Sequence, residues 1–400
     1  MTETIPALPE LPLSRTTLFD PPDALRPLQG NERVTRFSYP DGHLGWLVTG
    51  YSEARTVLAD PRFSARRELQ HFPIRHPMVP TEPTPAAPGS FPEMDPPDHT
   101  RYRKLLTGQF TARKMSLLAP RVEEIVTHYL DEMEKAGPSV DLLQAFAMPV
   151  PSLIICELLG VPYEERAQFQ TRSAVMVNMT STPEETAAAF RGLHQFVHEL
   201  VLAKRAAPTP DLLGELAAGD ELTDEELTTI GLNLLFAGHG LTANMLALGA
   251  FALIDAPEQL AALHAEPKLI DSAVEELLRY LTIVHVGPTR TALADVELGD
   301  QVVRAGETVT LSLPAANRDP ARYDQPDTLD ITRGSRGHLA LGHGLHQCLG
   351  QELARMQMRI AYPALFERFP DIRLAVPRDQ IPMRDQMAFY GVLALPVAWG

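Results

Sequence analysis

The pattern of hydrophobic and polar positions predicts a mainly helical protein with two small antiparallel β regions. Apolar residues recur at helical spacing in five stretches of the first half, residues 100–110, 119–134, 152–159, 162–179 and 183–206. Alternating patterns predict a hairpin around Asp41-Gly42 and a second β region over residues 286–313, with turns at Gly299-Asp300 and Ala305-Gly306. Strands and helices do not alternate along the chain, which disfavours a Rossmann core.

The longest predicted helix covers residues 224–256. Thr223 and Glu226 form a capping box at its start, and Pro257 follows its end. Residues 228–254 contain no Asp, Glu, Lys or Arg, which is also typical of a membrane span. Against a membrane span stand the polar residues distributed along this helix, Asn233, His239, Thr242 and Asn244. We therefore expect a core helix at the centre of a globular domain, and no membrane association.

A proline-rich segment, residues 72–97, precedes the helical region. It holds nine prolines and cannot form a helix. Loops of this length are usually functional or disordered, so the segment is either a linker between domains or a lid over a ligand. We favour the lid because strongly helical patterns follow immediately.

Composition and charge narrow the function classes. The net charge of −16 argues against nonspecific nucleic-acid binding as the main activity. Two distant cysteines, Cys156 and Cys348, cannot form a disulfide framework and fit a reducing compartment. Residues 1–18 contain acidic residues and prolines and no apolar stretch, so we expect no signal peptide and a cytoplasmic protein.

The candidate chemistry centres on Cys348, which is surrounded by glycines and followed by a helical pattern. Backbone N–H groups and the positive dipole at a helix start favour a thiolate over a thiol. Gly342, Gly344 and Gly350 would let the backbone pass close to a flat, bulky group, and neighbouring leucines would exclude water. This environment suits a soft, anionic axial ligand to iron.

Three other interpretations of Cys348 stay open from the residues alone. It could be an inert buried cysteine or a redox-active or nucleophilic cysteine. It could also form a zinc site with His338, His343 and His346, although the spacing H-x4-H-x2-H-x-C matches no usual zinc finger.

Residues 341–350, LGHGLHQCLG, resemble the haem loop of cytochromes P450, F-G-x-G-x-H-x-C-x-G, with Leu341 in place of the phenylalanine. Four further segments resemble family motifs in the family's order, at residues 95–103 (D-P-P-x-H-x-x-x-R), 237–239 (A-G-x), 276–279 (E-x-x-R) and 316–333. Five motifs in order make the resemblance specific, and it is greatest to soluble bacterial enzymes of actinomycete type. It implies the P450 fold, in which the long central helix crosses above the haem, and one haem domain over residues 1–400 with an extended segment at 1–20.

The resemblance implies heme b (iron protoporphyrin IX), with Cys348 as the iron ligand. Its two propionates would require cations at a buried site. The other residues implied to contact the cofactor are Leu341 and Gly342 in the loop and, at the propionates, His99, Arg103, Arg290 and His346. Glu276 and Arg279 are implied to form a structural ion pair, joined by an arginine such as Arg333.

The central helix departs from the family pattern A-G-x-[DE]-T. Gly240 occupies the acid position and Leu241 the threonine position, and these two side chains are credited in the family with delivering protons during oxygen activation. The remaining candidates are His239 and Thr242, and Thr242 lies roughly 100° around a regular helix, so a bulge would be needed to bring it into place. Ordered water or a substrate hydroxyl is the source we favour. Apart from these proton sources, the enzyme could activate oxygen poorly and then either use peroxide or couple inefficiently.

The activity implied by the resemblance is haem-thiolate monooxygenation, by hydroxylation or epoxidation, of a bulky apolar or polyketide- or macrolide-type secondary metabolite. No glycine-rich flavin or nucleotide module is present in the sequence, so a separate ferredoxin and its reductase are implied, and we expect a monomer. Basic residues that could steer an acidic ferredoxin are Arg113, Lys114, Arg355 and Arg359. The positions implied to contact substrate are Met176, Met179, Leu235, Phe236, Val284, His285 and Phe389.

The sequence also leaves rival functions open. A non-catalytic haem protein that binds a gas or stores a ligand is supported by the missing acid and threonine. A peroxide-driven P450 is supported by the same departure. A zinc-dependent hydrolase would use the histidines near Cys348.

Overall fold

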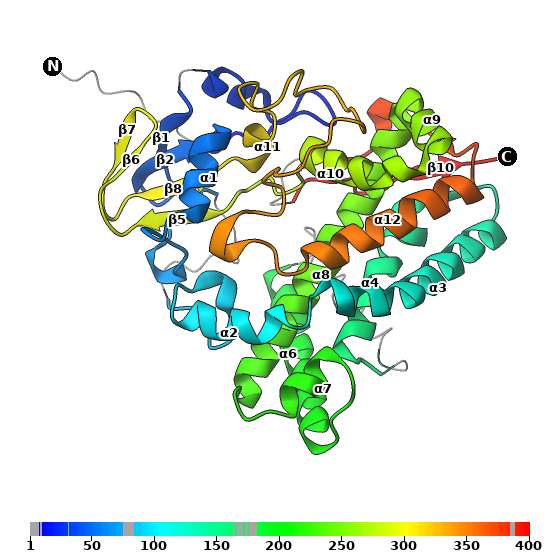
Figure 1. Cartoon of the computed structure of the whole chain (residues 1–400), viewed down its shortest axis with the longest axis horizontal. Coiled ribbons are helices and arrows are strands. Elements are labelled where there is room, and N and C mark those ends of the chain that lie inside the picture. Colours follow the sequence, from blue (N-terminus) through cyan, green and yellow to red (C-terminus); the bar gives the residue numbers. More distant parts are fainter. Residues whose placement is uncertain are drawn as a thin grey trace. The chain divides into compact units, whose positions relative to one another are not determined.

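The computed structural model describes residues 8, 10–30, 32–74, 84–162, 165, 171, 172, 175, 182–384 and 389–400. The chain forms two compact units, each built from three stretches (Figure 1). The first unit comprises Met1–Pro85, Leu248–Cys348 and Pro377–Leu393. The second comprises Ala86–Ala247, Leu349–Val376 and Ala394–Gly400. Because the chain passes repeatedly from one unit to the other, neither unit is a contiguous half of the sequence.

A five-stranded sheet in the order β1-β2-β8-β5-β3 organises the first unit (Figure 1). Its strands are β1 (Val34–Ser38), β2 (Leu44–Val48), β3 (Phe63–Ser64), β5 (Thr289–Ala292) and β8 (Thr308–Leu311). The β1–β2 hairpin turns at Gly42, which has φ +90°, as the Asp41-Gly42 pattern predicts. Strands β2 and β8 pair in parallel, whereas the other neighbours are antiparallel, so the predicted antiparallel pairing is wrong at this one contact between distant segments.

The remaining elements of the first unit surround this sheet. Strands β6 (Val296–Leu298) and β7 (Gln301–Val303) form a hairpin whose predicted turn is confirmed by Gly299 at φ +57°. The second predicted turn is confirmed by Gly306 at φ +86°, between β7 and β8. The other helices of this unit are α1 (Tyr51–Ala59), α9 (Pro257–Ala265), α10 (Ile270–Leu281) and α11 (Leu313–Ala316), with short helices η1 (Asp23–Leu25), η2 (Pro27–Gln29), η3 (Arg67–Leu69), η7 (Pro267–Leu269), η8 (Gly344–His346) and η9 (Arg378–Gln380). Apolar side chains of α1 and the sheet, such as Val48, Val57 and Leu311, form a buried core.

Helices dominate the second unit. They are α2 (Asp98–Thr107), α3 (Ala112–Ala136), α4 (Pro149–Leu159), α6 (Pro183–Ala206), α7 (Leu212–Ala217) and α12 (Gln351–Arg368), with short helices η4 (Phe91–Glu93) and η5 (Leu143–Ala147). Helices α3 and α12 pack side by side (Figure 1). A small sheet has the order β4-β10-β9, from Ser139–Asp141, Pro396–Ala398 and Arg373–Leu374.

Two predicted helices of this unit have different outcomes. The helix predicted over residues 183–206 coincides with α6, whose start is fixed by a capping box between Thr182 and Glu185. The helix predicted from residue 119 begins earlier, at Ala112, because the Thr111 side chain accepts a hydrogen bond from the Lys114 N–H and caps it. Helix α3 then continues through Pro120, which removes one backbone donor without ending the helix. The predicted helix at 162–179 lies largely outside the described residues.

Helix α8 (Asp224–Asp255) contributes residues to both units and is α-helical without interruption. The predicted capping box is confirmed, since the Thr223 side chain accepts from the Glu226 N–H at 3.2 Å and the Glu226 carboxylate accepts from the Thr223 N–H at 2.7 Å. By length and composition this helix could span a membrane, but 72% of its most apolar 18-residue window is buried inside the protein. Its apolar character is therefore explained by packing within the fold.

The cap of α8 leads to a prediction about stability and pH. The Glu226 carboxylate also accepts hydrogen bonds from Arg101 at 2.6 Å and Tyr102 at 2.7 Å, and the Arg101 contact is the main reason that the pKa of Glu226 is lowered to about 2. A lowered pKa means that this stabilisation is complete above about pH 4.5 and is lost as pH falls toward 2. We expect Glu226→Gln to reduce the free energy of unfolding at pH 7 by about 2 kcal/mol.

Urea unfolding at pH 7 and at pH 3 measures this effect. The difference between wild type and Glu226→Gln should shrink at pH 3, because the unfolded chain then keeps its proton. Glu225→Gln is the matched control, since Glu225 is exposed in the same helical turn. Equal losses in the two variants would contradict the role of the Glu226 contacts.

Candidate functional site

Cys348 lies in the first unit, between η8 and the start of α12, and is partly exposed. Its backbone N–H donates to the Leu341 carbonyl at 2.8 Å, and the Gly342 N–H donates to the Leu339 carbonyl at 2.9 Å. The segment from Leu339 to Cys348, which we call the cysteine loop, is therefore folded by its own backbone hydrogen bonds.

Two glycines shape the cysteine loop. Gly342 and Gly344 have φ values of +72° and +71°, in the left-handed region that favours glycine. At Gly344 a Cβ atom would lie 2.5 Å from the carbonyl oxygen of Leu58, at the end of α1. Helix η8 contacts α1, and the absence of a side chain at Gly344 allows the cysteine loop to pack directly against this helix.

We expect Gly344→Ala to disturb the cysteine loop. The substitution combines left-handed backbone strain with a steric clash, and should cost about 2–3 kcal/mol of unfolding free energy. Gly334→Ala is the matched control, because Gly334 has φ +66° but open space around a Cβ, so it isolates the backbone strain. Thermal unfolding of both variants compares the two costs, and an equal loss of stability would show that the contact with Leu58 is unimportant.

The histidines near Cys348 have partners that oppose a zinc site. His338 Nε2 lies 3.2 Å from the Glu275 carboxylate, and His343 Nε2 accepts from Arg55 Nε at 3.2 Å. Burial and the Arg55 charge lower the pKa of His343. Among the residues that the structure describes, no group of three or more His, Cys, Asp or Glu side chains is placed to hold a metal ion. The donor set at Cys348 thus fits a metal that brings its other ligands with it in a prosthetic group.

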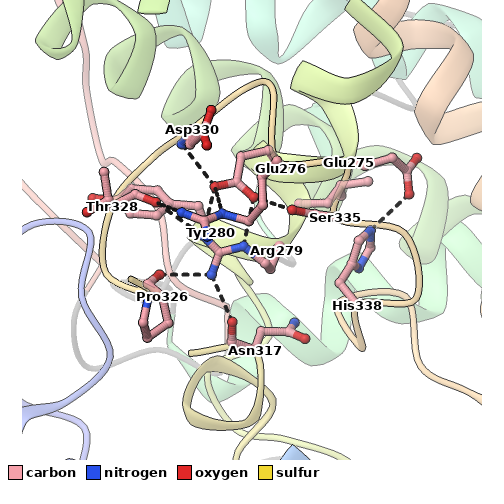
Figure 2. Close-up of polar contacts among 12 residues, drawn as sticks. Glu275, Glu276, Arg279, Tyr280, Asn317, Pro326, Thr328, Asp330, Ser335 and His338 are labelled. Carbon is pink, nitrogen blue, oxygen red and sulfur yellow. Dashed lines mark hydrogen bonds and ion pairs between the residues drawn. The ribbon is translucent and has the colours of Figure 1, made fainter. Parts of the chain in front are cut away.

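The unit that holds the cysteine loop also contains a buried ion-pair network, whose side chains are drawn in Figure 2. The Arg279 guanidinium donates to both carboxylate oxygens of Glu276, at 2.7 and 2.8 Å, and both side chains are fully buried. Arg333 donates to Glu276 at 3.2 Å, and the Ser335 hydroxyl also donates to it. The ion pair expected from E-x-x-R is present, with Arg333 as its third member.

Arg279 also ties together three chain segments. Its Nη1 donates to the backbone carbonyls of Asn317 and Pro326, both at 2.9 Å, and its Nη2 donates to that of Thr328 at 3.3 Å (Figure 2). The carbonyls of Asn317 and Pro326 would lose this donor if the guanidinium were removed, whereas that of Thr328 also accepts from Arg333 at 3.1 Å. The network therefore serves the folding of this unit rather than a reaction.

The residues expected at the haem propionates occur on both units. In the first, Arg290 is buried on β5 and donates to its own neighbour's carbonyl at Thr289, and His346 lies in η8, two residues before Cys348. In the second, His99 and Arg103 lie one turn apart on α2, with His99 fully buried and Arg103 partly buried. Leu341 and Gly342 are partly exposed in the cysteine loop.

On α8, partly or fully exposed residues form one stripe that includes Ala237, Gly240 and Leu241. His239 and Thr242 lie on the buried side, 4% and 7% exposed. Because the helix is uninterrupted here, no bulge rotates Thr242 toward Leu241. Burial lowers the pKa of His239 to about 4, so its imidazole is neutral at physiological pH.

The positions expected to contact substrate are distributed as follows. Val284 and Phe389 form an isolated antiparallel bridge, and Phe389 is 41% exposed. His285 is buried, with its ring edge-on to Tyr390 at a centroid distance of 5.7 Å. In the second unit, Leu235 is buried on α8 and Phe236 is partly exposed. Met176 and Met179 lie outside the described residues.

The described part of the proline-rich segment approaches α8. Residues 84–97 contain the short helix η4 and no α-helix, as the prolines predict. At Gly89 a Cβ would lie 2.5 Å from the Glu226 carbonyl oxygen, and Asn233 Nδ2 donates to the Gly89 carbonyl at 3.5 Å. This end of the segment is thus held on the helix that carries the exposed stripe.

The fold, the cysteine loop and the E-x-x-R network together define a cytochrome P450. The family model for cytochrome P450 matches residues 192–397. The chain belongs to the cytochrome P450 family, whose members are haem-iron monooxygenases, and the fold class predicted from the sequence is confirmed.

Its similarity to named relatives covers nearly the whole chain. Cytochrome P450 105C1 of a Streptomyces species is 50% identical over 386 residues, which are 96% of this chain and 97% of that protein. The solved structure of the LnmA cytochrome P450 hydroxylase from the leinamycin biosynthetic pathway of Streptomyces atroolivaceus is 41% identical, with a TM-score of 0.90, and covers 96% of this chain and 98% of that one. The structure of CYP105P1 in complex with filipin I is 41% identical, with a TM-score of 0.90 and coverage of 98% and 99%. The predicted actinomycete type is confirmed.

Proposed function

We propose that this enzyme inserts one oxygen atom of O2, by hydroxylation or epoxidation, into a bulky and mainly apolar secondary metabolite of polyketide or macrolide type. The observation that carries the proposal is the cysteine loop, which presents Cys348 directly before α12 on a backbone that two left-handed glycines shape. The substrate class is supported by relatives, one solved with filipin I and one a hydroxylase of leinamycin biosynthesis.

We assign heme b as the cofactor, and when bound it supplies the iron that activates dioxygen. Cys348 would ligate the iron, with Leu341 and Gly342 against the macrocycle. The positive dipole end of α12 favours the thiolate form of Cys348. The propionates would be bound by His99, Arg103, Arg290 and His346.

We assign the substrate end of the site to the Val284–Phe389 bridge, His285, Leu235 and Phe236, with Met176 and Met179. The proline-rich segment would act as a lid whose carboxyl end is anchored on α8 at Gly89. Excluding water in this way would keep the reaction from being quenched by solvent.

Electrons would come from a ferredoxin and its reductase. We propose that the enzyme is a monomer and acts in the cytoplasm. Arg113, Lys114, Arg355 and Arg359 are the proposed docking cations. Lys114 pairs with Glu215 at 2.5 Å and Arg355 lies 3.5 Å from Glu352, so docking of an acidic partner would compete with these contacts.

The proton source is the second part of the proposal. The acid and threonine positions, Gly240 and Leu241, lie on the exposed stripe of α8, whereas His239 and Thr242 are buried. We therefore propose that ordered water or a substrate hydroxyl beside Gly240 moves the protons, and that the sequence-based candidates His239 and Thr242 act through packing.

We expect the double substitution Gly240→Glu with Leu241→Thr to change turnover and coupling only modestly, by less than about tenfold, because a working proton path already exists. Product formed per NADPH consumed, and hydrogen peroxide released, measure the coupling. A rise of roughly a hundredfold would show that the native site lacks such a path. Thr242→Val is the matched control and should retain native coupling.

Reconstitution with a ferredoxin, its reductase, NADPH and isotopically labelled O2 tests the function. Candidate polyketides are first screened by the low-to-high-spin shift, and those that bind are then incubated. One labelled oxygen in the product supports the proposal. Product formed with peroxide alone would favour a peroxide-driven enzyme, and binding without oxidation by either route would favour a non-catalytic haem protein.

A further inference from the structure

Asn317, which Figure 2 shows beside Arg279, is a fully buried residue directly after α11. Its side chain joins two distant segments. Its Oδ1 accepts a hydrogen bond from the Leu339 N–H at 2.7 Å, and its Nδ2 donates to the Thr282 hydroxyl at 2.8 Å. Its backbone carbonyl accepts from Arg279 at 2.9 Å. Asn317 therefore connects the ion-pair network to the cysteine loop.

The contact with Leu339 acts at the start of the cysteine loop. The Leu339 carbonyl accepts from the Gly342 N–H, and the Leu341 carbonyl accepts from the Cys348 N–H, so the backbone at Cys348 is held through this first turn. The adjacent Ala340 N–H is accepted by His338 Nδ1 at 3.2 Å. Two consecutive amides of the loop are thus fixed by side chains rather than by regular secondary structure.

The other contact of Asn317 is with a strained residue. Thr282 has φ +33°, which is unusual for a β-branched residue, and its hydroxyl donates to the Arg279 carbonyl at 2.7 Å. Thr282 ends α10 and precedes Ile283, Val284 and His285. The carboxamide thus has two separable roles, an acceptor toward the cysteine loop and a donor toward the end of α10.

We propose that Asn317 is a positioning residue, whose carboxamide oxygen holds the Leu339 amide so that Cys348 stays in register to ligate iron. The inference rests on the proposed role of Cys348. Without this acceptor the first turn of the cysteine loop loses a side-chain anchor, and the thiolate is displaced from iron more readily. The donor contact with Thr282 is not needed for this role.

Three variants of the holoenzyme separate the two contacts. Asn317→Ala removes both contacts. Asn317→Asp keeps an acceptor for the Leu339 N–H but loses the N–H group that donates to Thr282. Thr282→Val removes the hydroxyl that accepts from Asn317 and leaves the Asn317 oxygen in place. Two quantities are measured, the rate at which the thiolate-type absorption band of the reduced, carbon monoxide-bound protein decays, and the hydrogen exchange of the Leu339–Ala340 peptide. Thermal midpoints by circular dichroism report global stability.

We expect Asn317→Ala to accelerate both the band decay and the exchange by about tenfold or more, as loss of one buried hydrogen bond to the loop predicts. Asn317→Asp and Thr282→Val should stay within about threefold of wild type. Asn317→Asp loses the hydrogen bond to Thr282, and Thr282→Val loses that bond together with the one from its hydroxyl to the Arg279 carbonyl. If the alanine variant is recovered unfolded, Asn317→Ser takes its place in the same comparison.

Two outcomes would overturn the inference. One is an Asn317→Ala or Asn317→Ser protein that decays no faster than Thr282→Val, which would reduce Asn317 to a general packing role. The other is an Asn317→Asp protein that decays as fast as Asn317→Ala. A wild-type protein without the thiolate band would instead refute the proposed role of Cys348, and the exchange at Leu339 would still report whether Asn317 holds the loop.

Discussion

Replacing Arg279 by alanine should destabilise the protein by about 3–5 kcal/mol, because it leaves the buried Glu276 carboxylate without its main countercharge. The same change removes the donor to the carbonyls of Asn317 and Pro326, and one of the two donors to that of Thr328. For a protein of ordinary stability, about 5–15 kcal/mol, this is a large fraction of the total. We expect the variant to accumulate poorly and to unfold at much lower urea concentration.

Two control variants test whether the guanidinium geometry and the burial of the Arg279 ion pair matter. Arg279→Lys keeps the charge but cannot donate to both carboxylate oxygens and to the backbone carbonyls at once, so an intermediate loss is expected. Lys135→Ala breaks an exposed pair with Glu132 at the end of α3 and should leave the urea midpoint unchanged. An Arg279→Ala protein as stable as Lys135→Ala would show that the buried network contributes nothing to stability.

Replacing Cys348 by alanine should abolish monooxygenase activity, lowering product formation by at least about a thousandfold, or about 4 kcal/mol of activation free energy. The fold should survive, because the thiol is partly exposed and the Cys348 backbone hydrogen bond to Leu341 does not involve the side chain. Far-ultraviolet circular dichroism should therefore match wild type while product formation is lost.

Cys156→Ala is the matched control for this second prediction. Cys156 is fully buried in α4 of the second unit, and its replacement leaves a small cavity costing about 1–2 kcal/mol. Activity should persist in the folded fraction. If Cys348→Ala kept native turnover, or if Cys156→Ala lost it without unfolding, the assignment of the reactive sulfur would be wrong.

The sequence predicted those elements that are determined by residues close together in the chain. The Asp41-Gly42 hairpin, the cap at Thr223 and the limits of α6 all depend on residues a few positions apart, and each was predictable. The start of α3 was not, because the apolar pattern was followed only from residue 119, whereas the Thr111 cap lies further upstream. The parallel pairing of β2 with β8 joins segments far apart in the chain, and no local pattern encodes it.

The candidate site shows the same division. The cysteine loop and the Glu276–Arg279 pair could be found because their residues form short motifs. The contacts of Asn317 could not be predicted, since its partners Thr282 and Leu339 lie 35 and 22 residues away, although Asn317 itself lies in the segment 316–333 that resembles a family motif. The sequence did not decide which side of α8 carries Thr242. The uninterrupted helix places Thr242 on the buried side.

The most direct test of the central claim is the absorption spectrum of the purified wild-type protein after reduction and addition of carbon monoxide, with iron measured in the same sample. If Cys348 ligates haem iron as a thiolate, the Soret band will lie at the red-shifted position after which the family is named, and it will be absent in Cys348→Ala. An iron-free protein, or a red-shifted band that survives in Cys348→Ala, would contradict the claim.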